Sequence, residues 1–306
     1  MENLTQKLAE ASWELFRKVE EKGGMASALA ASFPQNEISA IACKKRENLS
    51  TRKDIFVGTN MYSNLLEKPL EKRSADGLSV YQERKNFMEN FRTSGEINKH
   101  MEPLQKLSEV QKAGPETRME TLINAAFSSA SLGEMSSTLR QNRGEIPRVE
   151  PLHIHRGAEI FEGLRHAMDI YRNRHGRVPK VFLANMGPVS QHKARADFST
   201  GFFQVAGFEV ITNSGFETPQ QAAEAAVQSG AAIVVICSTD PTYPELVPLL
   251  VSSIKKEDAD IQVILAGYPK DQIEAHMASG VDDFVYVRAN AYEIFVKLLK
   301  KTGVIA

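Results

Sequence analysis

The stretch "PKVFLANMGPVSQHKARADFSTGFFQVAGFEVIT" (Pro179–Thr212) decides the fold of the C-terminal half of the chain. An unbroken apolar run, Val181–Asn185, comes first and is followed by a glycine–proline turn and a helical pattern over Ala194–Ala206. A second apolar run, "FEVIT", comes directly after the helix. Strand, turn, helix and strand in this order predict one unit of a parallel α/β sheet.

The same alternation continues to the end of the chain. Further strands are predicted in "AAIVVICS", "IQVILAG" and "VDDFVYV", and further helices over Pro219–Ser229, Tyr243–Lys256, Lys270–Ser279 and Asn290–Lys301. Unbroken Val/Ile/Leu runs are typical of strands that are buried on both faces, with helices on each side of the sheet. Residues 151–306 are therefore predicted to form a flavodoxin-like, doubly wound five-stranded parallel sheet, with its ligand at the carboxyl ends of the strands.

Two segments of different composition precede this domain. Residues 1–60 carry a helix that ends at Gly23 and Gly24, a second helix from about Glu37 to Ser50, and the strand-like piece "DIFVGTN". Residues 61–150 are polar and charge-rich until Met119, and an amphipathic helical pair is predicted over Glu116–Gly144. Before this pair the segment has too little apolar material for a core of its own, which predicts a helical linker or belt that packs on something else. Plain disorder is the alternative.

Composition sets broad limits on function. The 306 residues suffice for about two domains, and the apolar and charged fractions of 42% and 25% are ordinary for a globular protein. A net charge of −1 gives no reason to expect nucleic acid or an anionic membrane as a partner. No signal peptide or membrane-spanning run is recognisable, which predicts a cytoplasmic protein. Cys43 and Cys237 fit no metal or redox spacing and are expected to be free thiols.

One histidine, His192, follows the first strand of the predicted sheet, where a ligand is expected. A phospho-receiver needs acids after this strand and an aspartate at the end of the third strand, but the sequence has "ANMG" and "CST" there. A flavin phosphate cradle favours a loop rich in glycine and hydroxyl groups, and "GPVSQHKAR" is not one. The chain also has no G-x-G-x-x-G or Walker-type loop. The sequence therefore disfavours all of these ligands.

The same loop resembles the cobalamin-binding domain of the methylmalonyl-CoA mutase family, which carries D-x-H-x-x-G here and a Gly-Phe dipeptide before the second strand. Counted back from Gly207-Phe208, His192 falls on the family's cobalt-ligating histidine, Ser190 on the aspartate and Arg195 on the glycine. The opening "MENLTQKLAEASWELFRKVEEKGG" resembles the last helices of the family's substrate barrel. "LINAAFSSASLGEMSSTLRQNRG" resembles the segment that leads into the cobalamin domain. The resemblance implies that residues 1–60 are the tail of a truncated (β/α)₈ barrel.

The substitutions at this site imply that it is degraded. Ser190 lacks the charge that would orient the histidine, and loss of such a partner typically costs about 10–100-fold in metal affinity. Arg195 brings a long cation to a position that glycine would leave open. The family's S-x-L and Gly-Gly, which line the tunnel for the cofactor's nucleotide tail, are replaced by "CST", with Ser238 and Thr239, and by "AG", with Gly267. The site is predicted not to bind cobalamin, and His192 would be a cobalt ligand only if it did.

The phrases "FLANMG" and "GVDDFVYVRANAYEIFVKLL" resemble the small, non-catalytic subunit of heterodimeric mutases in this family. The resemblance implies a structural and assembly role in an adenosylcobalamin-dependent isomerase of methylmalonyl-CoA and succinyl-CoA. The partner would be the catalytic large subunit; the holoenzyme would hold the adenosylcobalamin, and this chain would hold none and no catalytic residue. A functional cobalamin-binding module with His192 as axial ligand and an interaction-only scaffold remain as alternatives. Self-association through the barrel-tail helix is also possible.

Other candidate residues have simpler interpretations. His153 and His155 lie on one face of an extended piece, but no third metal ligand is identifiable. Asp282 and Asp283 begin the last strand, away from the expected ligand face, so a capping or surface role is expected. The remaining histidines are expected at the surface: His100, His166, His175 and His276.

Overall fold

The computed structural model describes residues 1–67, 77–93, 99–110, 113–141 and 148–306 of the chain. Contacts divide the chain into two compact units, one formed by residues 1–67 and 150–306 and the other by residues 68–149. The N-terminal segment thus belongs to the same unit as the C-terminal domain, although more than eighty residues separate them in the sequence.

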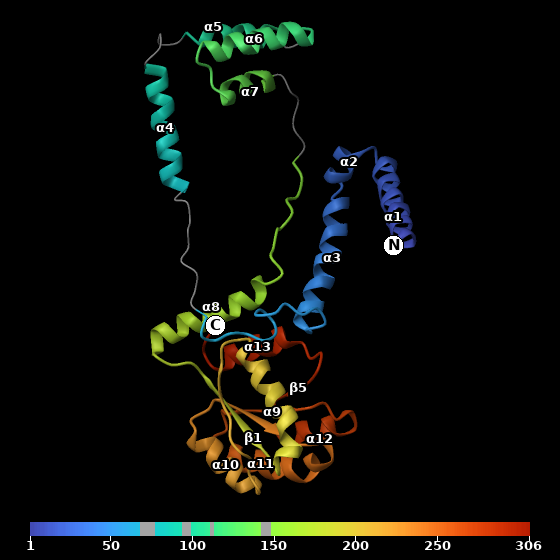
Figure 1. The fold of residues 1–306 in the computed structure, drawn as a ribbon, viewed down its shortest axis with the longest axis vertical. Helices are drawn as coiled ribbons and strands as arrows, with labels where there is room; N and C mark the ends of the chain where they lie inside the picture. Colours follow the sequence, from blue (N-terminus) through green and yellow to red (C-terminus); the bar gives the residue numbers. More distant parts are fainter. Residues whose placement is uncertain (68–76, 94–98, 111–112, 142–147) are drawn as a thin grey trace. The chain divides into compact units, whose positions relative to one another are not determined.

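The C-terminal domain is built on one parallel sheet of five strands, coloured yellow to red in Figure 1. The strands are β1 (Lys180–Asn185), β2 (Glu209–Ile211), β3 (Ile233–Cys237), β4 (Gln262–Ala266) and β5 (Asp283–Val285). Their order is β2-β1-β3-β4-β5, and every pair is parallel. This is the flavodoxin-like order, so the predicted doubly wound sheet is confirmed.

Helices cover both faces of the sheet. The helices of this domain are α8 (Glu159–His175), α9 (Val189–Gln204), α10 (Pro219–Gln228), α11 (Tyr243–Glu257), α12 (Ile273–Ala278) and α13 (Ala291–Lys301). Two short 3₁₀ turns, η2 (Asp240–Thr242) and η3 (Lys270–Gln272), precede α11 and α12. The prediction that the first crossover helix begins at Ala194 is wrong, because α9 begins five residues earlier, directly after Pro188.

Alternate residues of each central strand enter two separate cores. Val181 and Leu183 of β1 pack with apolar residues of α8, α9 and α13, whereas Phe182 and Ala184 pack with those of α10 and α11. This follows from the two-residue period of a strand, which sends successive side chains to opposite faces. The continuous apolar runs in the sequence reflect burial on both faces.

The N-terminal segment is helical, with α1 (Glu2–Glu21), α2 (Met25–Ala30) and α3 (Phe33–Ser50). The stop after α1 is confirmed, since Gly23 has a φ of +88°, a conformation that favours glycine. The predicted strand in "DIFVGTN" is wrong, because these residues form a loop with a single bridge between Val57 and Met61. The apolar strip of α1 is exposed, including Trp13 at 62%.

Two arginines and one asparagine hold the loop that follows α3. The amide of Asn60 is buried and donates to the carbonyls of Leu49 and Asp54. The Arg52 guanidinium lies over the ring of Phe202 in α9, at 4.5 Å from the ring centroid, and burial lowers its pKa to about 10. Arg165 of α8 donates to the carbonyls of Gly58 and Thr59 at 2.8 and 3.1 Å. The loop is therefore fastened to two helices of the C-terminal domain.

Arg165→Ala is expected to release this loop, because it removes two charge-assisted hydrogen bonds, each worth about 1.5–3 kcal/mol. Hydrogen exchange should show faster exchange of the amides of residues 55–61, while the amides of β1 and β3 keep their protection. Arg172→Ala is the control, since Arg172 pairs only with Asp169 on the same exposed helix face. Equal exchange of the loop amides in both variants would contradict the fastening role of Arg165.

The described part of the second unit contains four helices: α4 (Gly77–Thr93), α5 (Met101–Glu109), α6 (Pro115–Phe127) and α7 (Leu132–Arg140). The predicted amphipathic pair is confirmed as α6 and α7, although residues 142–144 lie outside the described part of the chain. Ser131 and Glu134 form a capping box at the start of α7, and Arg92 of α4 donates to Glu134 at 2.6 Å. Leu107 and Ala125 are fully buried between the helices.

Within the described ranges, no helix has the length and apolar character needed to cross a bilayer.

Candidate functional site

The candidate site lies at the carboxyl ends of β1, β3 and β4. The sheet order reverses between β1 and β3, and ligands of this fold class bind at that switch point. Three loops meet there: residues 186–188 after β1, residues 238–242 after β3 and residues 267–269 after β4. All six predicted site residues lie on these loops or in the first two turns of α9.

His192 lies in the first turn of α9, not in the preceding turn of the chain as the sequence suggested. Its side chain is 3% exposed, and Nδ1 lies 3.1 Å from the carbonyl of Gly187. Gly215 lies against the same edge of the ring, where an added Cβ would lie 2.7 Å from Cε1 and 3.3 Å from Nδ1 of His192. The imidazole is therefore largely buried, and its Nδ1 edge is held against the backbone.

Ser190 does not orient this histidine. It is exposed on the first turn of α9, and residues two apart on a helix do not face each other. The partner of the imidazole is the Gly187 carbonyl instead. The Ser190 hydroxyl therefore does not take the place of the family's aspartate in this structure.

Arg195 points to the other side of the site, where it meets loops that follow β3 and β4. Its Nη2 donates to Oδ1 of Asp240 at 2.7 Å, and its guanidinium lies 5.0 Å from the centroid of the Tyr243 ring. A Cβ added to Gly267 would lie 2.8 Å from Arg195 Nη1. Glycine at 267, with a φ of +134°, thus allows the guanidinium to approach the backbone.

Tyr243, the first residue of α11, completes this cluster and was not predicted as a site residue. Its side chain is fully buried, and its hydroxyl donates to the Ala266 carbonyl at 2.6 Å and accepts from the Ser238 amide at 3.1 Å. The hydroxyl therefore joins the ends of β3 and β4. The only sequence feature that could have pointed to this residue is its position directly after the loop "STDPT". A tyrosine at the start of a helix is equally typical of ordinary core packing.

The remaining predicted residues are held by local hydrogen bonds. Ser238 is buried, donates to the Met186 carbonyl at 3.4 Å and accepts from Thr242 Oγ1 at 2.9 Å. The Thr239 carbonyl accepts from the same Thr242 hydroxyl at 2.8 Å. Both loop residues are thus engaged within the chain, in the turn that leads into α11.

The charges in the site favour a closed cluster. Burial by itself lowers the pKa of Arg195, but Tyr243 and Asp240 beside it raise that pKa above its ordinary value, so the guanidinium stays charged. Burial raises the pKa of Tyr243 more than the neighbouring Arg195 lowers it, so the phenol keeps its proton and donates it to Ala266. Arg195 Nη1 is buried and has no hydrogen-bond partner within the described residues.

Side chains of the chain itself lie where the resemblance would place a cobalamin. The resemblance places the nucleotide tail of the cofactor beside the loops of Ser238 and Gly267, and Arg195 and Tyr243 fill the space there. It places cobalt on His192, which is 3% exposed and whose Nδ1 lies against the Gly187 carbonyl. No reaction step is therefore assigned to a cofactor bound by this chain.

Other histidines and acids have structural roles. His276, expected at the surface, is 2% exposed, and its ring packs edge-on against Tyr243. His153 and His155 stack on each other, and the described residues hold no group of three or more metal-ligating side chains. Asp282 accepts from the Val263 amide and from Lys255, which confirms its expected capping role.

The two thiols are expected to differ sharply in reactivity. Cys43 is exposed, whereas Cys237 is buried at the end of β3, and burial raises its pKa to about 12. Because the thiolate is the reactive form, a thiol-specific disulfide reagent should modify one cysteine quickly and the second only after unfolding. Cys43→Ser should abolish the fast reaction. A fast reaction that persists in this variant would show that β3 opens readily.

The sheet order and the position of the cluster define a doubly wound α/β domain of the flavodoxin-like class. Residues 1–145 match the methylmalonyl-CoA mutase family. The methylmalonyl-CoA mutase small subunit of Porphyromonas gingivalis is 26% identical over 304 residues, which is 99% of this chain and 38% of that protein. The small subunit of Streptomyces virginiae is 25% identical over 99% of this chain and 37% of its own length. The first 145 residues thus match this family, and the whole chain is similar to its small subunits, although it spans less than two thirds of the length of these relatives.

Large subunits are also among the relatives. The large subunit of Porphyromonas gingivalis is 24% identical over 87% of this chain and 38% of its own length. A crystal structure described as a novel cobalamin-binding protein from Desulfitobacterium hafniense aligns with 63% of this chain and 97% of its own, at 17% identity and a TM-score of 0.34.

Proposed function

We propose that this chain is a portion of the non-catalytic subunit of an adenosylcobalamin-dependent methylmalonyl-CoA mutase, with a structural and assembly role. The observation that carries the proposal is the closed cluster in which Arg195, Asp240 and Tyr243 occupy the space beside Gly267. Because side chains of the chain itself fill the site, it favours a role in stabilising the domain over a role in binding a cofactor. The small-subunit relatives, which align over 99% of the chain, support the same assignment.

In this proposal the three parts of the chain have different roles. Residues 1–60 form the terminal elements of a substrate-barrel domain, residues 61–150 form the belt, and residues 151–306 form the cobalamin-domain-like unit. The exposed apolar residues of α1 and α4, such as Trp13 and Phe87, support burial against further protein. The partner is the catalytic large subunit, which holds the adenosylcobalamin, and the assembly works in the cytoplasm.

Co-production of the affinity-tagged chain with the methylmalonyl-CoA mutase large subunit from the same genome tests this proposal. We expect a stoichiometric complex in which cobalamin content equals that of the large subunit and does not change in His192→Ala. A cobalamin-binding module predicts additional cobalamin that is lost in His192→Ala. An interaction-only scaffold predicts no complex with the large subunit, and either result would overturn the proposal.

A further inference from the structure

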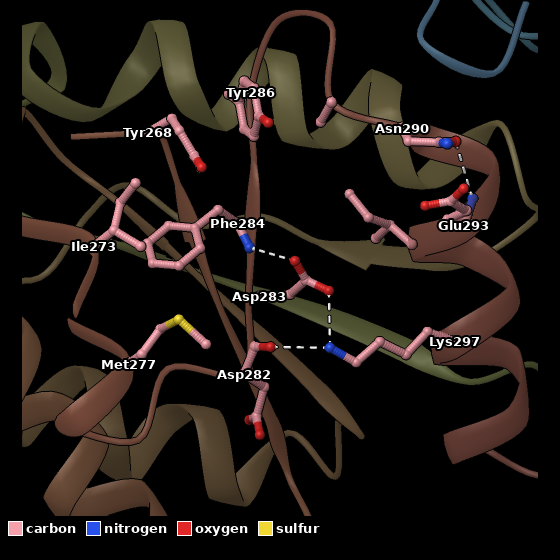
Figure 2. Close-up of a pocket in the computed structure, with 12 residues that line it drawn as sticks. Tyr268, Ile273, Met277, Asp282, Asp283, Phe284, Tyr286, Asn290, Glu293 and Lys297 are labelled. Carbon is pink, nitrogen blue, oxygen red and sulfur yellow. Dashed lines mark hydrogen bonds and ion pairs between the residues drawn. The ribbon is translucent and has the colours of Figure 1, made fainter. Parts of the chain in front are cut away.

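The β5 strand forms one of the two edges of the sheet, and a groove of about 450 Å³ runs beside it. Figure 2 shows the strand as the floor of this groove, with Met277 and Ile273 on one side and Lys297 and Glu293 on the other. An edge strand normally presents unpaired N–H and C=O groups, which allow another chain to add a strand. Another chain could add a strand in this groove only if the outward N–H and C=O groups of β5 were free of hydrogen bonds.

The direction of the backbone groups follows from the pairing with β4. The Val285 carbonyl accepts from the Gly267 amide at 2.8 Å and therefore faces the sheet. Because backbone groups of successive residues in a strand point to opposite sides, the Phe284 amide faces the groove. Asp282 precedes β5, and its amide donates to the Val263 carbonyl of β4 at 2.7 Å, but its carbonyl lies within reach of Lys297 Nζ, which lines the groove. The Phe284 amide and the Asp282 carbonyl are the two groups to which an added strand would bind.

Side chains of the same domain already occupy both groups. Asp283 Oδ1 accepts from the Phe284 amide at 2.9 Å, and Lys297 Nζ of α13 donates to the Asp282 carbonyl at 3.0 Å. The same Nζ donates to Asp283 Oδ2 at 2.9 Å, so the two side chains hold each other in place, as Figure 2 shows. A carboxylate thus supplies the acceptor, and an ammonium the donor, that a neighbouring strand would supply.

From this geometry we infer that Asp283 and Lys297 close the β5 edge against strand addition by a second copy of the chain. The groove itself favours association once the edge is free, because its apolar wall includes Tyr268 and Met277, which are 41% and 56% exposed. The ion pair is partly solvated, at 28% and 47% exposure, and such pairs add little to folding stability. Its effect is therefore on pairing of the edge and not on the fold.

The double variant Asp283→Ala/Lys297→Ala tests this inference in the full chain. Sedimentation velocity over a range of concentrations should show self-association at least about tenfold tighter than in the wild type. The control is Lys193→Ala/Asp197→Ala, which removes an exposed pair of the same two residue types from α9, with no contact to a strand edge. Asp283→Asn keeps an oxygen acceptor for the Phe284 amide and should stay close to the wild type.

Hydrogen exchange separates this edge from other surfaces such as the apolar face of α1. In dilute double variant the Phe284 amide should exchange faster than in the wild type, and in concentrated double variant association should protect it again. Unchanged sedimentation of a folded double variant, an equal shift in the Lys193/Asp197 control, or association that leaves the Phe284 amide unprotected would each overturn the inference.

Discussion

Tyr243→Phe is expected to lower the free energy of unfolding of the C-terminal domain by about 2 kcal/mol or more. The substitution removes one oxygen atom and leaves the Ala266 carbonyl without its 2.6 Å donor and the Ser238 amide without its acceptor. Both groups lie at the buried ends of β3 and β4, and an unsatisfied buried group costs about 1–3 kcal/mol. The ring remains, so packing against Arg195 and His276 is kept.

Urea unfolding followed by circular dichroism measures this effect. Tyr268→Phe is the matched control, since Tyr268 lies on the loop after β4 and is 41% exposed, and its change should stay within about 0.5 kcal/mol. Equal stability of Tyr243→Phe and Tyr268→Phe would mean that the hydroxyl of Tyr243 does not join the two strands.

Gly215→Ala should destabilise the domain by about 2–4 kcal/mol, because the new methyl group has no space and the backbone favours glycine. The φ of Gly215 is +107°, and an added Cβ would lie 2.7 Å from His192 Cε1 and 2.9 Å from the Gly187 carbonyl oxygen. Gly230→Ala is the control for the backbone alone, since Gly230 has a φ of +64° and nothing within 4 Å of an added Cβ. Its cost should be about 1 kcal/mol.

A double-mutant cycle extends this test to His192. In Gly215→Ala/His192→Ala the clash with the imidazole disappears, while the contact with the Gly187 carbonyl remains. The cost of Gly215→Ala should therefore fall, but not vanish, in the His192→Ala background. If the two costs simply add, His192 does not pack against Gly215, and its ring is freer than the structure indicates.

The sheet was predictable because its signal is local. The central strands β1, β3 and β4 contain unbroken apolar runs, and β3, with all five residues apolar and buried, has the clearest such run. The helix α4 was not predicted as a separate element, and the loop after α3 was assigned to a strand. The segment "DIFVGTN" has a strand-like composition but forms a loop. The Asn60 side chain accepts from the Phe56 amide, and Arg165 donates to the Gly58 carbonyl, so these backbone groups bind side chains and not a neighbouring strand.

The candidate site was only partly predictable, because its contacts join residues far apart in the sequence. The bulk of Arg195 was evident, but its pairing with Asp240, 45 residues later, and its position against Gly267 depend on the ordering of β3 and β4. Tyr243 had no signal that separates it from an ordinary core residue. His192 was placed in a loop because the helical pattern becomes amphipathic only after it, whereas α9 begins at Val189.

A visible-absorbance titration of cobalamin with the folded chain, its His192→Ala variant and its Arg195→Ala variant tests the closed site most directly. We predict no change in the cobalamin spectrum with the wild type or with His192→Ala, because His192 is largely buried and Arg195 and Tyr243 occupy the space beside Gly267. A shift of the wild-type titration to the base-off, histidine-ligated spectrum that is lost in His192→Ala would contradict this prediction and make the chain a cofactor carrier.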